Sequence, residues 1–474
     1  LGANPTAASF DLEMIRSIAD TGRIAGISHR RANGVAAREF AYGYEPAPSG
    51  APSSLVRTVT AAGSGWSLTR MFDPVHDVPT AVETRWNGVI QSRHAYQYNA
   101  VALRDTAVQT GEAFADVGAT YQRLTYGSRG ELRSAYGYAG SDPGSTARPL
   151  ASRLHDYTHD AAGNRLTANP SGDPALRDDF TADALNRLRQ RENNALFVAG
   201  TVSASPGVRV AVSGSAPASP GSEVEAGRAG GHWGTGIVVN NLTAPFLGTV
   251  TAFAVLPGGG LGGADLVRRE SRDFFLPPAV QSFAYDEDGN LTSDGIWDYA
   301  WDAENRLVRM SATAVSVAAG RPALTLSFQY DHLGRRVRKE VRSGAGLTPV
   351  SERRYVYDGW NVVAELDGTA AIRRTFAWGL DLNGGVGTAG GVGGLLQIQD
   401  AAAGKTLLPA FDGNGNVTVL LNADTGAIEA SYEYSPFGEV LRANGPYAAA
   451  NPLRFSTKWQ DEETALLYYG YRYY

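Results

Sequence analysis

Apolar and polar residues alternate over short stretches of this chain, and pairs of aromatic residues recur two positions apart. In FAYDEDGNLTSDGIWDYAWDAENRL, residues 283–307, two aromatic residues stand three and one positions before Asp286. Two more stand at the same spacing before Asp302. Side chains two positions apart point to the same face of a β-strand. The pattern therefore predicts short strands with an aromatic stripe on one face, joined by tight turns.

The aspartate of each such phrase is followed three positions later by Gly or Asn. The pairs are Asp160 and Gly163, Asp183 and Asn186, Asp286 and Gly289, Asp302 and Asn305, Asp331 and Gly334, Asp358 and Asn361, and Asp412 and Gly415. An Asp that opens a turn accepts a backbone N–H two residues later, and the position after that needs a left-handed backbone. Gly adopts this conformation without steric cost, and Asn tolerates it next best. Each phrase predicts a β-hairpin in which these residues form the turn.

The aspartates and the aromatic stripe each allow a second interpretation. The stretches DEDGN and DGNGN are faintly similar to calcium loops, but they lack the closing bidentate Glu of a helix–loop–helix site, so we expect no metal. The aromatic stripe suits either sugar binding or ring packing between successive hairpins. Because the stripe follows the repeat so regularly, ring packing is favoured.

Composition limits the classes of function. Hydrophobic residues make up 43% of the 474 residues and charged residues 19%, which allows a buried core, and 56 glycines agree with many turns. A net charge of −6 does not favour a nucleic-acid partner. The chain has no cysteine, so disulfides and thiolate metal sites are excluded. No apolar run is long enough to span a membrane, and no cofactor motif occurs in a suitable context, so we expect neither a membrane span nor a cofactor.

The repeat is interrupted at residues 191–279. This stretch is rich in Val, Ala, Ser, Gly and Pro, and its short β-branched runs between turn residues predict a small, immunoglobulin-like β-sandwich. Because repeats flank it, we interpret it as an inserted domain, either a spacer or an adhesive, lectin-like module. Residues 1–190 and 280–400 are then the repeat hairpins, and residues 401–474 form a further terminal part.

Three stretches outside the simple repeat carry a family resemblance. They are WGLDLNGGVGTAGGVGGLL (378–396), FDGNGNVTVLLNADTGAIEASYEYSPFGEVL (411–441) and NPLRFSTKWQDEETALLYYGYRYY (451–474). Together with the hairpin phrase, they resemble the YD-repeat proteins of the RHS (rearrangement-hotspot) family, which include teneurins and the C component of bacterial Tc toxins. The resemblance covers most of the chain, weakly before about Tyr96 and not at 191–279. It identifies residues 401–474 as an RHS-associated core.

The resemblance implies an architecture and a function. In such proteins repeated hairpins form a spiralling sheet that closes as a hollow shell around an unfolded or toxic cargo. We therefore expect a non-enzymatic scaffold in a secreted or cell-surface bacterial protein, with its own C-terminal cargo domain as partner. The alternative is an extracellular adhesion or carbohydrate-binding protein, with glycans or self-association as its interactions.

The resemblance also points to candidate catalytic residues. Self-cleaving relatives release their C-terminal domain by chemistry similar to that of an aspartyl protease, and one of the acids lies near the stretch that contains Asp461 and Glu462 here. Their second acid lies beyond the position of Tyr474, and an aspartyl dyad needs two carboxylates that share a proton. We therefore expect no cleavage by this chain alone.

Two departures from the family pattern concern the backbone. Relatives usually have Gly where Ser456 or Thr457 stands, and Gly in place of Ala465. Ala adopts a left-handed conformation less readily than Gly, so we expect the turn at Ala465 to be costly.

Overall fold

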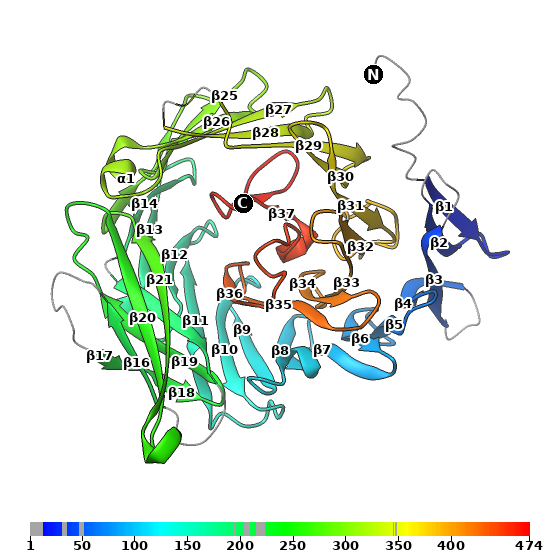
Figure 1. The fold of residues 1–474 in the computed structure, drawn as a ribbon, viewed down its shortest axis with the longest axis horizontal. Helices are drawn as coiled ribbons and strands as arrows, with labels where there is room; N and C mark the ends of the chain where they lie inside the picture. Colours follow the sequence, from blue (N-terminus) through cyan, green and yellow to red (C-terminus); the bar gives the residue numbers. More distant parts are fainter. Residues whose placement is uncertain are drawn as a thin grey trace. The chain divides into compact units, whose positions relative to one another are not determined.

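The computed structural model describes residues 13–30, 36–46, 52–193, 195–202, 209–214, 223–344, 346 and 348–474. Parts of the expected insert, at 194, 203–208 and 215–222, lie outside the described residues. The described residues form 38 β-strands and one α-helix, α1 (Ala314–Ala318). With five residues, α1 is far shorter than the roughly 20 residues that a membrane-spanning helix needs. The predicted all-β fold is confirmed (Figure 1).

The chain folds as two compact units. Unit 1 comprises the described residues up to Gln97, together with Gln109–Ala113 and Tyr355–Tyr474, and unit 2 comprises Tyr98–Val108 and Phe114–Arg354. The elements that pass from one unit to the other are β7 (Val89–Tyr98), β8 (Arg104–Thr110), η1 (Glu112–Phe114) and β29 (Ser351–Asp358). The division into four segments at 190, 279 and 400 stays a prediction.

Unit 1 contains two series of antiparallel strands in which neighbours along the chain are neighbours in the sheet. The first series is β1 (Glu13–Ile18), β2 (Ile24–Arg30), β3 (Ala36–Pro46), β4 (Pro52–Ala61), β5 (Trp66–Phe72) and β6 (Pro79–Trp86), continued by β7. The second is β30 (Asn361–Asp367), β31 (Ile372–Trp378), β32 (Leu395–Asp400), β33 (Lys405–Phe411), β34 (Val417–Asn422), β35 (Ile428–Tyr434) and β36 (Val440–Asn444). A terminal segment follows, with η4 (Phe455–Thr457), β37 (Trp459–Gln460) and β38 (Leu467–Tyr468).

The two series of unit 1 share a buried apolar core. Phe40, Leu407 and Leu408 are fully buried there. Buried Trp66 of β5 donates its indole N–H to the Pro409 carbonyl of β33 at 3.2 Å, so the indole nitrogen is satisfied inside the core.

Unit 2 holds the same kind of hairpin series on both sides of the insert. Before the insert lie β9 (Thr120–Tyr126), β10 (Leu132–Ala139), β11 (Pro149–His159), β12 (Arg165–Asn169), η2 (Pro174–Leu176), β13 (Asp178–Ala182) and β14 (Leu188–Glu192). After it lie β22 (Val280–Ser282), β23 (Ala284–Tyr285), β24 (Leu291–Ser293), β25 (Trp297–Trp301), β26 (Leu307–Ala312), β27 (Leu324–Tyr330) and β28 (Arg336–Ser343), and β28 pairs with β29.

The insert leaves and re-enters the repeat sheet between two paired strands. β14 and β22 are antiparallel neighbours, with Gln190 opposite Ser282. The Asn193 N–H donates to the Ala279 carbonyl at 2.8 Å, and the Asn241 side chain donates to the carbonyls of Asn193 and Pro277. The repeat pairing therefore continues across the base of the insert.

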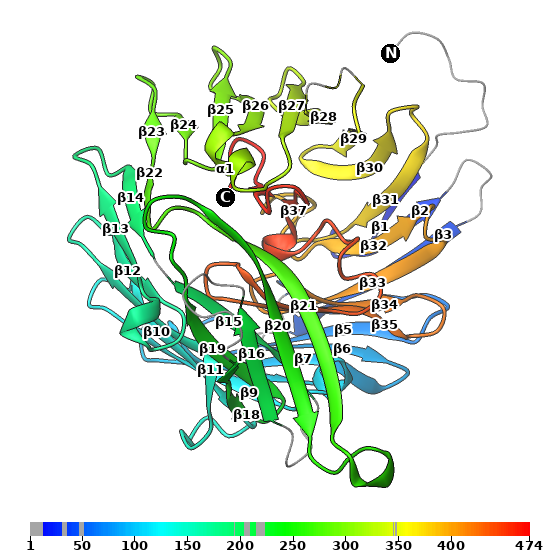
Figure 2. The same cartoon turned by 60° about the vertical axis from the view of Figure 1, so that its left-hand side comes forward.

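The insert itself consists of two small sheets. One holds β15 (Ala195–Thr201), β18 (Gly227–Ala229) and β19 (His232–Val238); the other holds β16 (Arg209–Gly214), β17 (Glu223–Glu225), β20 (Phe246–Leu256) and β21 (Leu266–Leu276), with η3 (Leu261–Gly263) between the last two. Figure 2 shows the strands of both sheets, among them β15, β16 and β18–β21. Trp233 of one sheet and Val250 of the other share a core. The predicted β-sandwich is therefore present.

Candidate functional site

The turn of each repeat is organised by its aspartate. In the turn at Asp331, Oδ1 accepts the backbone N–H groups of Leu333 and Arg335 at 2.9 and 3.0 Å, and Oδ2 accepts the Arg335 Nε–H at 2.7 Å. Gly334 has φ 77° and donates its N–H to the Asp331 carbonyl. A register shift next to Tyr330 marks a β-bulge at the residue before the aspartate. This is the bulged three-residue hairpin loop, in which the left-handed position favours Gly.

The same arrangement recurs in other repeats. The aspartates that accept hydrogen bonds in this way are Asp160, Asp183, Asp286, Asp302, Asp331 and Asp412, and the left-handed residues are Gly163, Asn186, Gly289, Asn305, Gly334 and Gly415. Neighbouring turns are also joined, because the Asn290 amide donates to Asn305 Oδ1 at 2.8 Å. The carboxylate oxygens of these aspartates accept hydrogen bonds from N–H groups of their own turns.

The turn expected at Asp358 and Asn361 has a different geometry. Gly359, with φ 56°, is the first residue of a two-residue loop, and Asn361 already belongs to β30. A glycine directly after the aspartate permits the shorter loop, which needs its left-handed residue at that earlier position. Asn361 is thereby placed inside unit 1, only 4% exposed, and its Oδ1 has no hydrogen-bond partner among the described residues.

Two turns have the same geometry but do not match the sequence pattern. Asn99 and Asp367 each accept the N–H groups two and four residues later, and the left-handed positions are Ala102 (φ 58°) and Ala370 (φ 66°). The separation of three is kept, but Ala replaces Gly or Asn. A search for an Asn or Asp that follows alternating apolar residues, without a required Gly, would have found them.

In several repeats an aromatic residue at the end of a strand connects successive hairpins. The hydroxyls of Tyr285 and Tyr330 donate to the carbonyls of Leu188 and Leu307, each at 2.7 Å and each in the preceding hairpin. Three further hydroxyls donate in the same way, from Tyr44 to Ile24, from Tyr126 to Arg104 and from Tyr434 to Val417, and the Trp301 indole N–H donates to the Leu291 carbonyl. Burial raises the pKa of Tyr434 well above its ordinary value, so its hydroxyl remains a donor.

An arginine of the preceding turn covers the same ring. The Arg187 guanidinium lies 4.9 Å from the centre of the Tyr285 ring, and that of Arg306 lies 5.6 Å from the centre of the Tyr330 ring. The stripe is therefore joined to the preceding hairpin through hydroxyl groups and arginine side chains. Ring packing between hairpins stays a prediction.

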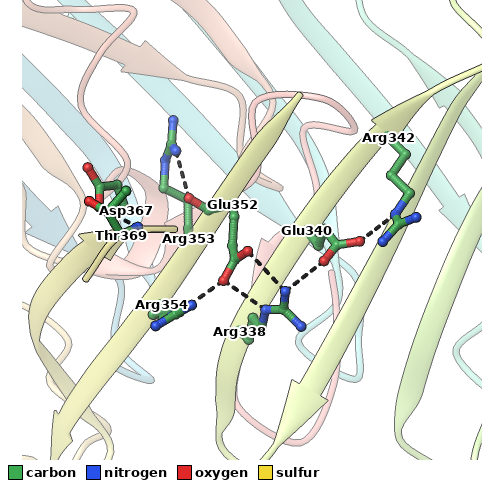
Figure 3. A network of polar contacts seen from close by, with 8 residues as sticks. All are labelled: Arg338, Glu340, Arg342, Glu352, Arg353, Arg354, Asp367 and Thr369. Atoms are coloured by element: carbon green, nitrogen blue, oxygen red, sulfur yellow. Dashed lines mark hydrogen bonds and ion pairs between the residues drawn. The ribbon is translucent and has the colours of Figure 1, made fainter. Parts of the chain in front are cut away.

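A charged network lies on one face of β28 and β29 in unit 2. Arg338 donates to both carboxylate oxygens of Glu352 at 2.9 Å and to Glu340 at 2.7 Å, while Arg354 and Arg342 bind the outer sides of these carboxylates (Figure 3). The hydrogen bonds from Arg338, followed by those from Arg354, lower the pKa of Glu352 to about 2. Each carboxylate is paired, so the network joins neighbouring strands.

The terminal segment of unit 1 is hydrogen-bonded to the repeat turn at Asp412. Ser456 and Thr457 both have positive φ, 51° and 53°, at the positions where the family pattern has Gly. The Ser456 N–H donates to Asn416 Oδ1, and the Thr457 hydroxyl donates to the Gly415 carbonyl at 2.6 Å. These contacts hold β37 and β38 next to the turn at Asp412.

Asp461 and Glu462 lie in the turn between β37 and β38. Asp461 is 1% exposed, whereas Glu462 is exposed to solvent. The Asp461 N–H donates to the Leu466 carbonyl, and Ala465 has the expected left-handed backbone, with φ 61°. The two candidates therefore do not share one buried site, and a catalytic role for either stays a prediction.

A carboxylate that the sequence reasoning missed organises the glycine-rich segment. Asp381 is 2% exposed and accepts hydrogen bonds from the N–H groups of Ala389 and Gly391 and from the Thr388 hydroxyl. The loop connects β31 to the adjacent strand β32. Gly385, Gly387 and Gly390, which have the spacing of a dinucleotide-binding fingerprint, therefore belong to a strand-to-strand loop.

A cavity of about 310 Å³ lies in unit 1 between this loop, β29–β31 and the terminal segment. Its aromatic walls are Tyr357, Trp360, Trp378, Trp459, Tyr468, Tyr469 and Tyr471. Its polar groups include Asn361 and Lys458, and the Lys458 ammonium donates to the Gly390 carbonyl. Burial lowers the pKa of Lys458, and the nearby charge of Asp381 partly opposes this.

Comparison with known proteins finds relatives for part of the chain. No protein-family model matches. The tRNA3(Ser)-specific nuclease WapA of Bacillus spizizenii is 29% identical over 197 residues, and the tRNA(Glu)-specific nuclease WapA of Bacillus subtilis subsp. natto is 30% identical over 197 residues. In both cases the match covers 41% of this chain and 7% of the relative.

Solved structures give a whole-chain match at low sequence identity. The crystal structure of TcdB2-TccC3 matches 97% of this chain and 22% of its own, with 14% identity and a TM-score of 0.40. The Tc holotoxin pore of Photorhabdus luminescens matches 98% of this chain and 22% of its own, again with 14% identity and a TM-score of 0.40. The WapA matches are consistent with the RHS resemblance.

Proposed function

We propose that this chain is a structural scaffold that encloses or presents a C-terminal, toxin-like cargo in a secreted or cell-surface bacterial RHS protein. The observation that carries the proposal is the contact between successive hairpins. The hydroxyls of Tyr285 and Tyr330, each directly before an aspartate, donate to backbone carbonyls of the preceding hairpin. An arginine of that hairpin covers each ring. Such contacts build a regular wall from repeated units.

The use of the aromatic residues favours a scaffold over an adhesin that binds glycans along the stripe. A ring that is covered by arginine and held by its hydroxyl is not available to stack on an external sugar. Interior strands are paired on both sides, which limits the exposed edges that invite aggregation. These features suit a wall that confines a partner, and we propose that the wall closes as a shell.

The relatives support a toxin context. The WapA proteins are named as tRNA nucleases, and the matched region is a small share of their length. We propose that an equivalent activity here belongs to the cargo, and that the hairpin region has no catalytic role.

Protease protection tests the scaffold. A flexible reporter with a protease site is fused after Tyr474, and its cleavage is compared with that of the free reporter. We expect much slower cleavage in the fusion. As a control, the same reporter is fused to the isolated insert, residues 193–279, if that segment expresses as a folded domain. Equal cleavage rates in the intact fusion and the free reporter would rule out enclosure.

The terminal segment offers a second test. If the core releases its cargo, Asp461, which is buried, is the better acid of the two candidates. The natural gene product is tagged at both ends and its intact mass is measured. We expect two fragments that remain together, a single chain after Asp461→Asn, and normal cleavage after Glu462→Gln. An uncut natural product would contradict the release mechanism.

A further inference from the structure

The last strand of the insert is an open sheet edge. β21 ends the four-stranded sheet, whose order is β17, β16, β20, β21, and among the described residues no strand pairs with its other side. The strand has 11 residues, and the first eight, 266–273, are exposed to solvent. The long hairpin of β20 and β21 can be followed in Figure 2, with η3 at its tip. Such an edge offers a row of backbone N–H and C=O groups to another strand.

The sequence of this strand, LVRRESRDFFL, has charges that are complementary about its middle serine. Glu270 and Arg272 stand one position before and after Ser271, and Arg269 and Asp273 stand two positions before and after it. The two members of each pair carry opposite charges. A strand with this order is complementary to a second copy of itself that runs antiparallel about Ser271, as in a two-fold symmetric contact.

In that register each charge of the central five residues meets its opposite. Arg269 lies opposite Asp273 of the second copy, and Glu270 lies opposite its Arg272. The same two pairs occur again on the other side of the axis at Ser271. Opposite charges that face each other across an antiparallel pair stabilise it, and like charges destabilise it.

The ends of the strand are matched in polarity as well. Leu266 would lie opposite Leu276, and Val267 opposite Phe275. Leu266 and Val267 are 39% and 47% exposed, so a paired strand would cover apolar surface that now faces solvent. The last three residues of β21 are already half-buried, so the central five positions contribute most to the selection of the register.

Neighbouring registers place like charges opposite each other. A shift by one position sets Arg269 against Arg272. The opposite shift sets Glu270 against Asp273. Shifts by two positions set either Glu270 or Arg272 against its own copy, and a parallel pair in register sets every charge against its like. The antiparallel pair about Ser271 is therefore selected by charge over these alternatives.

The charged side chains are free enough to exchange partners. Arg272 and Glu270 form an ion pair at 2.6 Å, but their side chains are 76% and 66% exposed. Asp273 accepts the exposed Thr249 hydroxyl at 2.6 Å, and the Arg269 guanidinium lies over a ring of β20. Exposed contacts of this kind contribute little to stability, so their replacement by contacts across a strand pair costs little.

We propose that β21 pairs antiparallel with β21 of a second copy about a two-fold axis at Ser271, so that the insert joins two copies of this chain through one continuous sheet. Backbone hydrogen bonds between the two edges supply the affinity, and the order of charges sets the register. Charges on an edge strand often only prevent pairing, and that interpretation predicts a monomer. The inference is independent of the proposed scaffold, because it requires neither a cargo nor a closed shell.

The test uses the full chain in sedimentation velocity over a wide range of concentrations. The variants are Arg269→Asp and Asp273→Arg. Each one alone sets two pairs of like charges against each other in the proposed dimer, whereas an equimolar mixture of the two variants restores opposite charges in both pairs. The control is Glu287→Arg, which makes the same change of charge as Asp273→Arg at an exposed turn position of the repeat.

The expected result is a concentration-dependent dimer of the natural chain, with a dissociation constant raised about tenfold or more in either variant and unchanged in the control. The mixture should dimerise like the natural chain, which also shows that both variants are folded. Three outcomes overturn the proposal. A natural chain that stays monomeric leaves the edge protected or open to a strand of another protein. A dimer that both variants retain uses another surface. A mixture that dimerises no better than either variant alone excludes the pairing about Ser271.

Discussion

At the residue scale, the repeat depends on one carboxylate and one left-handed backbone position. Asp331 binds the two N–H groups that the turn would otherwise leave open, and Gly334 allows the chain to reverse. Both features are local, so they were predictable from the sequence. Asn361 was placed wrongly in the turn because Gly359, one position after Asp358, competes for the left-handed position and shortens the loop.

Left-handed alanines should be sites of avoidable strain. Ala370 has φ 66° and is exposed, so Ala370→Gly is expected to raise the free energy of unfolding by about 1 kcal/mol. Urea unfolding of the full chain measures the change. The control is Ala443→Gly, at an exposed strand position without positive φ, which should lower the free energy of unfolding by about 0.5–1 kcal/mol. A loss of stability in both variants would contradict the strain argument.

At the element scale, the hairpins are joined by contacts that alternation alone does not specify. The sequence predicted that two aromatic residues share a face. It did not predict that the hydroxyl of the second residue donates to a backbone carbonyl of the preceding hairpin. That contact depends on how far one hairpin is displaced along the next, which the β-bulge before each aspartate sets.

Removal of one such hydroxyl should weaken the contact between hairpins. Tyr330→Phe takes away the bond to Leu307 and leaves that carbonyl with one partner fewer, at an expected cost of about 1 kcal/mol in the free energy of unfolding. Tyr471→Phe is the control, because its ring is 77% exposed, and it should change the free energy of unfolding by less than about 0.5 kcal/mol. Equal effects in chemical denaturation would mean that the hydroxyl contact contributes nothing.

The insert should be removable. Asn193 and Ala279 are hydrogen-bonded across the base of the insert, so an Asn-Gly linker that replaces residues 194–278 should close a two-residue hairpin between β14 and β22. We expect a folded chain with the same β-rich circular dichroism and a cooperative unfolding transition. The insert also packs on the region after α1, since the Arg321 guanidinium lies 4.8 Å from the Phe275 ring centre, so some loss of stability is expected. An aggregated product would show that the insert is an integral part of unit 2.

At the scale of the whole molecule, the all-β fold was predictable and the cavity was not. The fold follows from repeated local signals, each a few residues long. The cavity brings together Asn361, Thr388 and Lys458, which are far apart in the sequence and meet only through the topology of unit 1. Asp381 and Lys458 carry no motif of their own, so only the three-dimensional arrangement identifies them.

Acid sensitivity is a further property of the whole chain, because carboxylates with lowered pKa recur in it. The amide of Asn164 lowers the pKa of Asp160, and hydrogen bonds from Arg338 lower that of Glu352 to about 2, from an ordinary 4.5. Since the unfolded chain binds these protons more tightly, the stability that Glu352 contributes is complete above about pH 4.5 and is lost as the pH falls towards 2. Glu352→Gln should therefore be less stable than the natural chain at pH 7, and the difference should shrink between pH 4.5 and 2. Urea midpoints at pH 7, 5, 3 and 2 measure this.

The same series separates the charged network from a general effect of acid. High salt at pH 7 should reduce the difference between Glu352→Gln and the natural chain, because the network lies close to solvent and is screened. Glu287→Gln, at an exposed turn position, should leave the midpoint nearly unchanged at every pH. If the difference for Glu352→Gln stays constant from pH 7 to pH 2, loss of its charge is not what weakens the fold. The acid sensitivity would then have to come from the turn aspartates, which bind backbone N–H groups through the same carboxylate chemistry in each repeat.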